Sequence, residues 1–210
     1  LRQPRFESWS PSHFIYLSLK GQLSACQCWR LWFTKTVRPA RAIRSEPLNV
    51  SSDWPKEVFS VLIAQGIDLV AHVPDAGHTA LIRLAEERDA VDVITLTTEE
   101  EGVGLLCGAW AGGRKGVLLI QSSGVGNCIN ALALPVICRA PFFTIVSMRG
   151  EWGEFIPWQV PMGLATPKVL GAMDVEVFRV SEEQRVAETV SAAGSFAFNT
   201  RRSAAVLLSQ

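Results

Sequence analysis

The sequence of 210 residues has no apolar run that approaches the roughly 18 residues needed for a membrane-spanning helix. It also has no net charge, because 20 Lys and Arg residues balance 20 Asp and Glu residues. The balance is uneven: eight basic and two acidic residues lie in 1–50, which leaves 51–210 with an acidic excess of six. A basic groove for nucleic acid is therefore not expected in 51–210, and we predict neither a nucleic-acid nor a membrane partner.

Cysteine is scarce and irregularly spaced. The five cysteines cannot all pair, and three of them lie inside apolar segments, where a reduced and buried thiol is the usual state. Cys26 and Cys28 have no second Cys or His pair that would complete a zinc site, and we expect no metal ligands in this chain. Reduced thiols are typical of a cytoplasmic protein, and this is the compartment that we predict.

The chain divides into two parts of different character. Residues 1–50 have no sustained period of 2 or 3.6 and are rich in Arg, Ser and Trp. Their excess of Arg over acids resembles an organelle-targeting leader, and the first residue is Leu rather than Met. We interpret 1–50 as an extension that is disordered, targeting or artefactual, and we place the domain at 53–210.

Residues 53–210 alternate between apolar strand patterns and helical patterns. Strands are expected at 68–73, 91–96, 116–121, 142–147, 175–180 and 204–208, and helices at 53–66, 76–90, 99–111, 125–138, 166–173 and 182–199. The strands are apolar throughout, so we predict an α/β fold with a parallel sheet of about six strands and helices on both faces. Such sheets bind ligands beyond the carboxyl ends of their strands, which directs attention to the loops found there.

Three acids, Glu99 to Glu101, begin the third expected helix, and Gly102, Gly104 and Gly108 follow them. Acids in a first helical turn often only complement the helix dipole. The glycines, however, leave one side of the helix almost bare, which lets another backbone or a flat aromatic ligand approach closely. The segment therefore has both a structural and a ligand-binding interpretation.

The turn 121–127 is rich in Ser and Gly. Its Gly124-Val125-Gly126 sequence follows an expected strand but lacks the third glycine of the dinucleotide fingerprint and the Lys-Ser/Thr of a P-loop. A flavodoxin-like or nucleotide-binding module is therefore disfavoured. Taken alone, the turn is a tight strand-to-helix connection capped by Ser123.

Four stretches form an ordered set: VPDAGHTALIRL (73–84), TTEEEGVGLLCGAWAGG (97–113), LLIQSSGVGNCINAL (118–132) and SMRGEWGEFIPWQVPMGLATPKVL (147–170). Together they resemble the alpha, pyrimidine-binding subunit of the thiamine-diphosphate-dependent sulfopyruvate and phosphonopyruvate decarboxylases. The resemblance implies non-oxidative decarboxylation of a 3-sulfo- or 3-phosphonopyruvate-like 2-oxo acid to the aldehyde and CO₂. The alternatives are a decarboxylase of another anionic 2-oxo acid and a non-catalytic pyrimidine-domain partner protein.

The same resemblance implies roles for individual residues. Glu99, nine positions before Gly108, is the carboxyl group that would activate thiamine diphosphate by bonding to its aminopyrimidine ring. Ser122, Ser123 and Asn127 are the other candidates for cofactor binding.

The long irregular segment 148–162 holds the candidates for substrate binding. Arg149 would pair with a sulfonate, phosphonate or carboxylate, or else form a structural ion pair with Glu151 or Glu154. Gln159 is the second substrate-binding candidate.

Asp75 and His78 follow the first expected strand. Because a histidine can carry protons near neutral pH, the two residues are candidates for a catalytic role in proton transfer. The alternative is that they only cap the following helix.

One motif of the family is missing. Its diphosphate-binding domain carries Gly-Asp-Gly, and this sequence occurs nowhere in the chain. The resemblance therefore implies half an active site, completed by a separate beta subunit that holds Mg²⁺ and the diphosphate of thiamine diphosphate. We expect a hetero-oligomer with a small anionic 2-oxo acid as substrate.

Overall fold

The computed structural model describes residues 53–209, so the interpretation of 1–50 concerns residues outside the described range. Six parallel strands form one sheet in the order β2-β1-β3-β4-β6-β5. The strands are β1 (Leu69–His72), β2 (Asp92–Thr95), β3 (Gly116–Gln121), β4 (Phe142–Ser147), β5 (Val175–Val180) and β6 (Ser203–Leu208). The predicted fold class is confirmed.

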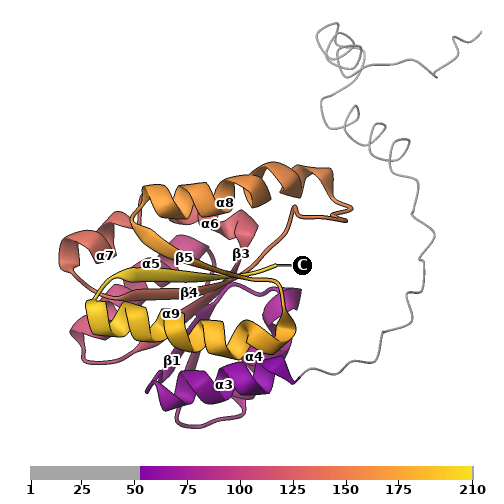
Figure 1. Cartoon of the computed structure of the whole chain (residues 1–210). Coiled ribbons are helices and arrows are strands. Elements are labelled where there is room, and N and C mark those ends of the chain that lie inside the picture. The colour runs from indigo at the N-terminus through magenta and orange to yellow at the C-terminus, as the bar shows by residue number, and fades with distance from the viewer. Residues whose placement is uncertain (1–52, 210) are drawn as a thin grey trace, which may run out of the picture. The chain divides into compact units, whose positions relative to one another are not determined.

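Helices cover both faces of the sheet (Figure 1). One face carries α3 (Trp54–Ala64), α4 (Thr79–Glu86) and α9 (Val186–Thr200), and the other carries α5 (Glu99–Ala111), α6 (Ser122–Cys128), α7 (Ala133–Cys138) and α8 (Val160–Ala172). Three short 3-10 turns, η2 (Ala76–His78), η3 (Pro157–Gln159) and η4 (Glu183–Arg185), precede α4, α8 and α9. None of the helices within 53–209 is long and apolar enough to cross a membrane.

Two apolar cores lie between the sheet and its helices. Alternate residues of one strand face opposite ways, so Val117 and Leu119 of β3 join the α3, α4 and α9 core, while Leu118 and Ile120 join the other. The inner strands β1, β3, β4 and β6 are buried almost throughout. The edge strands β2 and β5 are partly exposed and contain Asp92, Glu176 and Arg179, so the expectation that every strand is apolar along its whole length was wrong for the edges.

The helix expected at 125–138 begins earlier and is broken. Helix α6 starts at Ser122, directly after β3, so the expected Ser/Gly turn does not exist and Ser123 caps nothing. The helix ends at Cys128, and α7 begins at Ala133. Pro135 explains the second start, because a proline has no backbone N–H to donate and is tolerated only in the first turn of a helix.

The helix expected at 166–173 also begins earlier. Helix α8 starts at Val160 with Pro161 in its first turn, where the missing N–H costs nothing. Pro167 lies inside the helix, next to Thr166, whose hydroxyl donates to the Met162 carbonyl at 2.8 Å. The irregular segment after β4 is therefore shorter than expected. In addition, α4 ends at Glu86 rather than at residue 90.

The topology reverses direction between β1 and β3. From β1 the chain moves outward to β2, and from β3 it moves the opposite way to β4, so these two neighbouring strands form a topological switch point. Ligands of open α/β sheets bind in the crevice at such a point, beyond the carboxyl ends of the strands. Asp75 follows β1 and Gln121 ends β3, so both residues lie at this crevice.

Candidate active site

Glu99, the first residue of α5, is half-buried and lies against α6. The Nδ2 group of Asn127 donates to Glu99 Oε2 at 2.7 Å. A side chain at Gly124 would overlap the carboxyl group of Glu99, so the glycine provides the space in which this carboxyl lies. The sequence-based candidates Glu99 and Asn127 are therefore brought together by two helices on the same face of the sheet.

The two neighbouring acids differ from Glu99. Glu100 is exposed. Glu101 folds back on the start of the helix, where its carboxylate accepts from the hydroxyl of Thr97 at 2.8 Å and from the Thr97 backbone N–H at 3.0 Å. These hydrogen bonds lower the pKa of Glu101. Glu101 thus has the structural role that was one interpretation of all three acids.

The glycines of α5 are divided between two environments. Gly104 and Gly108 are exposed, and a Cβ added to either would meet no atom within 4 Å. Gly102 faces the sheet, where an added Cβ would collide with the Leu118 side chain. The bare strip of α5 therefore exists at Gly104 and Gly108 but does not include Gly102.

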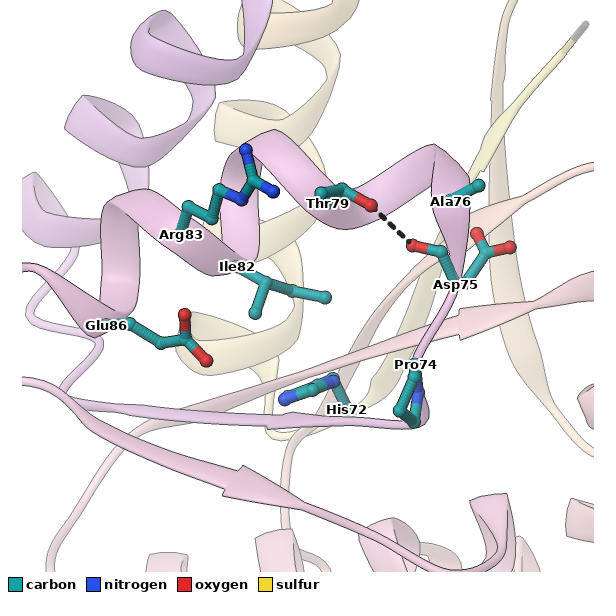
Figure 2. A pocket seen from close by; sticks show the side chains of 8 residues that line it. All are labelled: His72, Pro74, Asp75, Ala76, Thr79, Ile82, Arg83 and Glu86. Carbon is teal, nitrogen blue, oxygen red and sulfur yellow. Dashed lines mark hydrogen bonds between the residues drawn. The ribbon is translucent and has the colours of Figure 1, made fainter.

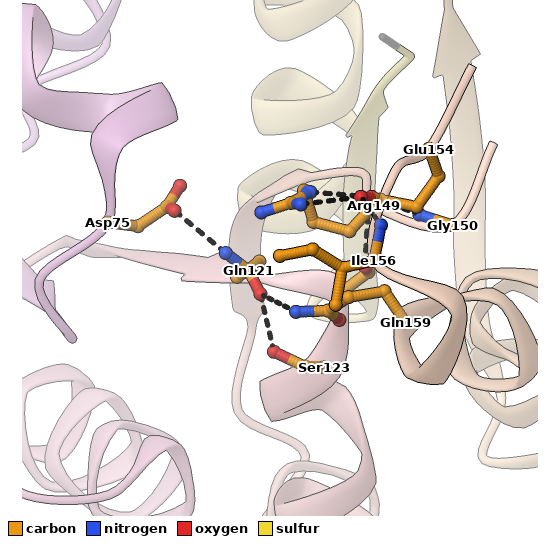
Figure 3. A network of polar contacts seen from close by, with 9 residues as sticks. Asp75, Gln121, Ser123, Arg149, Gly150, Glu154, Ile156 and Gln159 are labelled. Atoms are coloured by element: carbon orange, nitrogen blue, oxygen red, sulfur yellow. Dashed lines mark hydrogen bonds and ion pairs between the residues drawn. The ribbon is translucent and has the colours of Figure 1, made fainter. Parts of the chain in front are cut away.

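A polar network crosses the switch point (Figure 3). Gln121 lies at its centre and donates through Nε2 to Asp75 Oδ1 at 2.9 Å. The Oε1 atom of Gln121 accepts from the Ser123 hydroxyl at 2.7 Å and from Gln159 Nε2 at 3.2 Å. Ser147 at the end of β4 donates to Asp75 Oδ2 at 2.5 Å. The network thus joins the ends of three adjacent strands with η3.

Arg149 forms the ion pair that was the alternative to substrate binding. Its Nε and Nη2 atoms each donate to one oxygen of Glu154 at 2.7 Å, and the Glu154 side chain is only 1% exposed. The backbone N–H groups of Gly150 and Ile156 also donate to Glu154, both at 3.0 Å. The bonds from Arg149 and from Gly150 lower the pKa of Glu154 to about 2. Glu154 therefore fixes the loop 149–156, because it accepts hydrogen bonds from three residues of that loop. Glu151 instead pairs with Arg179.

His78 is fully buried beneath the network. Its Nε2 atom lies 3.1 Å from the carbonyl oxygen of Ile120, which can only accept, so Nε2 carries the proton. Burial lowers the pKa of His78, which keeps the imidazole neutral near pH 7. Because no part of the ring reaches the surface, the structure favours a structural role over proton transfer.

Asp75 has the cap function that was considered for it, since its side chain accepts from the backbone N–H of Gly77 at 3.1 Å. It also borders a pocket of about 410 Å³ on the α4 side of β1 (Figure 2). The pocket is lined by His72, Pro74, Asp75, Ala76, Thr79, Ile82, Arg83 and Glu86. Asp75 is thus the link between this pocket and the network around Gln121.

The two serine candidates have structural partners. Ser122 is fully buried, and its hydroxyl oxygen accepts from the backbone N–H of Arg149 at 2.9 Å. Ser123 is half-buried and donates to Gln121. Gln121 itself was missed as a site residue, although a signal existed, because it is the one polar side chain in β3. No group of three side chains able to hold a metal ion is found within 53–209.

Comparison with curated proteins finds relatives that are all named as sulfopyruvate or phosphonopyruvate decarboxylases or their alpha subunits. The chain is 34% identical over 152 residues to the sulfopyruvate decarboxylase alpha subunit of Methanococcus maripaludis, covering 72% of this chain and 91% of that protein. It is 32% identical over 151 residues to the same subunit of Methanocaldococcus jannaschii, covering 71% and 89%. Phosphonopyruvate decarboxylase of Streptomyces viridochromogenes is 34% identical over 122 residues, which cover 57% of this chain and 31% of that protein.

Comparison with solved structures supports the fold. A 2-oxoglutarate:ferredoxin oxidoreductase from Magnetococcus marinus aligns with a TM-score of 0.62 at 16% identity, covering 97% of this chain and 39% of that chain. No protein-family model matches the sequence. The agreement of the alpha-subunit relatives over about nine tenths of their own length is the decisive observation. The chain therefore belongs to the family of sulfopyruvate decarboxylase alpha subunits.

Proposed function

We propose that this chain is the alpha subunit of a thiamine-diphosphate-dependent decarboxylase, which converts a 3-sulfo- or 3-phosphonopyruvate-like 2-oxo acid to the aldehyde and CO₂. The observation that carries the proposal is the position of Glu99, whose carboxyl group is held by Asn127 over the bare backbone of Gly124. A decarboxylase of another anionic 2-oxo acid would use Glu99 in the same way, whereas a non-catalytic pyrimidine-domain partner would keep this fold without using Glu99.

The residues around Glu99 fit an aminopyrimidine ring. Asn127 occupies Oε2 and leaves Oε1 without a hydrogen bond from any other residue of 53–209, so Oε1 is available to a ring nitrogen. Thiamine diphosphate, once bound, supplies the electron-accepting ring on which a 2-oxo acid loses CO₂. The role of Glu99 is to hold a proton at the ring nitrogen.

The substrate anion is proposed to meet Arg149 from the side that Glu154 does not occupy. Glu154 uses Nε and Nη2, whereas Nη1 has no hydrogen-bond acceptor among the described residues. The Glu154 pair fixes the guanidinium plane and raises the pKa of Arg149, so its charge is permanent. It also neutralises much of that charge, so Arg149 would orient an anion more than attract it from a distance.

A partner subunit is proposed to cover the loop after β4. Trp152 is 98% exposed, Phe155 83% and Trp158 69%, which is unusual for three aromatic side chains in one short loop. Aromatic side chains of this kind are typical anchors of protein interfaces. The partner would be the beta subunit, and it would hold Mg²⁺ and the diphosphate. We place this hetero-oligomer in the cytoplasm.

The proposal is tested by co-expressing the chain with its beta subunit and measuring CO₂ release from sulfopyruvate and phosphonopyruvate with Mg²⁺ and thiamine diphosphate. Glu99→Gln is expected to lower turnover about a hundredfold or more, as loss of a proton-transfer group does. Glu100→Gln is the matched control, since Glu100 is exposed one position away, and it should retain activity. Full turnover of Glu99→Gln would remove Glu99 from the mechanism. A complex that assembles and releases no CO₂ from any 2-oxo acid would favour the non-catalytic alternative.

A further inference from the structure

Asp75, Gln121 and Gln159 lie end to end across the switch point (Figure 3). Asp75 accepts at both of its oxygens, from Gln121 on Oδ1 and from Ser147 and the Gly77 backbone on Oδ2. Gln121 then accepts on its own oxygen from Gln159. The three side chains therefore form a continuous line of hydrogen bonds with one direction.

The charge of Asp75 at one end of this line decides how the amide of Gln159 is oriented at the other end. The oxygen and nitrogen of an amide are similar in size, so the partners determine which way the amide turns. A carboxylate only accepts, so Gln121 must turn its nitrogen toward Asp75 and its oxygen toward Gln159. Gln159 must then turn its nitrogen toward Gln121. The oxygen of Gln159 is left without a donor among the described residues, although the residue is only 4% exposed.

We propose that Gln121 is a positioning residue that transmits the carboxylate character of Asp75 to Gln159, so that Gln159 presents a buried acceptor to a hydrogen-bond donor of the bound ligand. A buried acceptor without a donor is costly, so this oxygen is expected to be satisfied when the site is filled. A fully ionised sulfonated or phosphonated 2-oxo acid offers acceptors only. Gln159 therefore receives a donor such as an amino group or a held water, rather than the substrate anion itself.

The orientation of the Gln121 and Gln159 amides follows from residues of this chain alone, whereas the contact between Gln159 and a ligand rests on the proposed function. We call the line of hydrogen bonds from Asp75 through Gln121 to Gln159 the relay. Moving the carboxylate from position 75 to position 121 distinguishes an effect of the relay from a direct catalytic role of Asp75. In the double variant Asp75→Asn/Gln121→Glu, the carboxylate moves to position 121 and still accepts from Ser123 and Gln159. The amide at position 75 donates to it and accepts from Ser147 and Gly77. Only the bond between positions 75 and 121 reverses, and the bonds from Ser123, Gln159, Ser147 and Gly77 keep their direction.

Each single variant disrupts the direction of the hydrogen bonds between positions 75, 121 and 159. Asp75→Asn allows Gln121 to turn its oxygen toward position 75, and Gln159 then turns its nitrogen outward. Gln121→Glu places two carboxylates at hydrogen-bond distance, which is repulsive. Each single change is expected to weaken thiamine diphosphate binding by the assembled alpha–beta complex about tenfold, and the double change is expected to restore it to within about threefold.

The experiment combines two readouts. Thiamine diphosphate affinity of the complex is followed by intrinsic fluorescence, and exchange of the Gln159 side-chain NH₂ protons by NMR of the full chain. These protons should be protected in the original and double variants and exchange faster in Asp75→Asn. A double variant that binds no better than the weaker single variant, with its melting temperature retained, would overturn the relay. Unchanged Gln159 exchange in Asp75→Asn would overturn it as well. If the original complex binds no cofactor, the proposed function fails, and the exchange pattern still decides the relay.

Discussion

The carboxyl group of Glu99 in α5 occupies the space where Gly124 in α6 would carry a side chain. The two residues come from consecutive strand–helix units, and Asn127, one helical turn after Gly124, fixes the carboxyl group from the same helix. Packing of α6 against α5 therefore sets the position of Glu99. This contact connects the fold to the proposed chemistry.

Gly124→Ala is expected to displace Glu99 and lower turnover of the alpha–beta complex about a hundredfold, because the added methyl group overlaps the carboxyl group. The effect should not come from loss of fold. Alanine is a better helix former than glycine by about 1 kcal/mol, which offsets part of the local strain. CO₂ release and thermal unfolding, measured on the same preparation, check both statements.

Gly126→Ala is the matched control for this change. It lies in the same helix, and its added Cβ would be 3.5 Å from Met162 Sδ, an ordinary contact. This variant should keep its activity and gain slightly in stability. Equal activity of the two variants would show that the carboxyl group of Glu99 need not lie where the structure places it.

The Arg149–Glu154 loop is expected to lose stability in acid. Glu154 has a folded-state pKa of about 2, below its ordinary value of 4.5, so its bonds stabilise the loop fully above pH 4.5 and are lost as the pH falls through 2. Glu154→Gln should therefore be less stable than the original chain at neutral pH, and the difference should shrink as the pH falls through this window. Denaturant unfolding of both proteins across the pH range measures it.

The control for the acid effect is Glu188→Gln. Glu188 is 77% exposed and lies 3.9 Å from Arg185, so its pair should contribute little at any pH. A stability difference for Glu154→Gln that does not change with pH would contradict the depressed pKa of Glu154.

The cysteines of 53–209 should differ sharply in reactivity. Cys128 is 2% exposed, and burial raises the pKa of its thiol to about 12, so the reactive thiolate is almost absent at neutral pH. Cys138 is exposed at the end of α7. Alkylation followed by peptide mapping should modify Cys138 within minutes and Cys128 only after unfolding. Early modification of Cys128 would mean that α6 opens readily from the core.

Trp152→Ser is expected to weaken association with the beta subunit about tenfold or more, as truncation of an aromatic interface anchor does. Because Trp152 is 98% exposed, the melting temperature of the alpha chain should not change. Ile137→Ser, on α7, removes a side chain that is 78% exposed and lies outside this loop, and it should leave the affinity unaltered. Binding is measured by titration of the purified subunits. Unaltered affinity of Trp152→Ser would place the interface elsewhere.

Much of the fold could be predicted from local pattern. The strands 116–121, 142–147 and 175–180 and the helix 99–111 have the bounds that the sequence indicated. Buried strands are recognisable because apolar runs of this length end at turn residues. The starts of α6 and α8 were missed, because Ser, Gly and Pro indicate a loop locally. Packing between α6 and α8 overrides that preference, and the Thr166 hydroxyl, which donates to the Met162 carbonyl, also lies 3.3 Å from the Ser122 carbonyl.

For the candidate site too, one part could be predicted from the sequence and another part only from the tertiary structure. The sequence by itself determined the parallel α/β fold and the family, and it predicted Glu99 as the activating acid among three, because each depends on residue types in order along the chain. Only the tertiary structure decided which side chains meet. Glu154 rather than Glu151 pairs with Arg149, His78 lies inside the core, and Gln121 joins Asp75 to Gln159. Such pairings depend on which strand ends are neighbours in the sheet, and residue order along the chain does not contain that information.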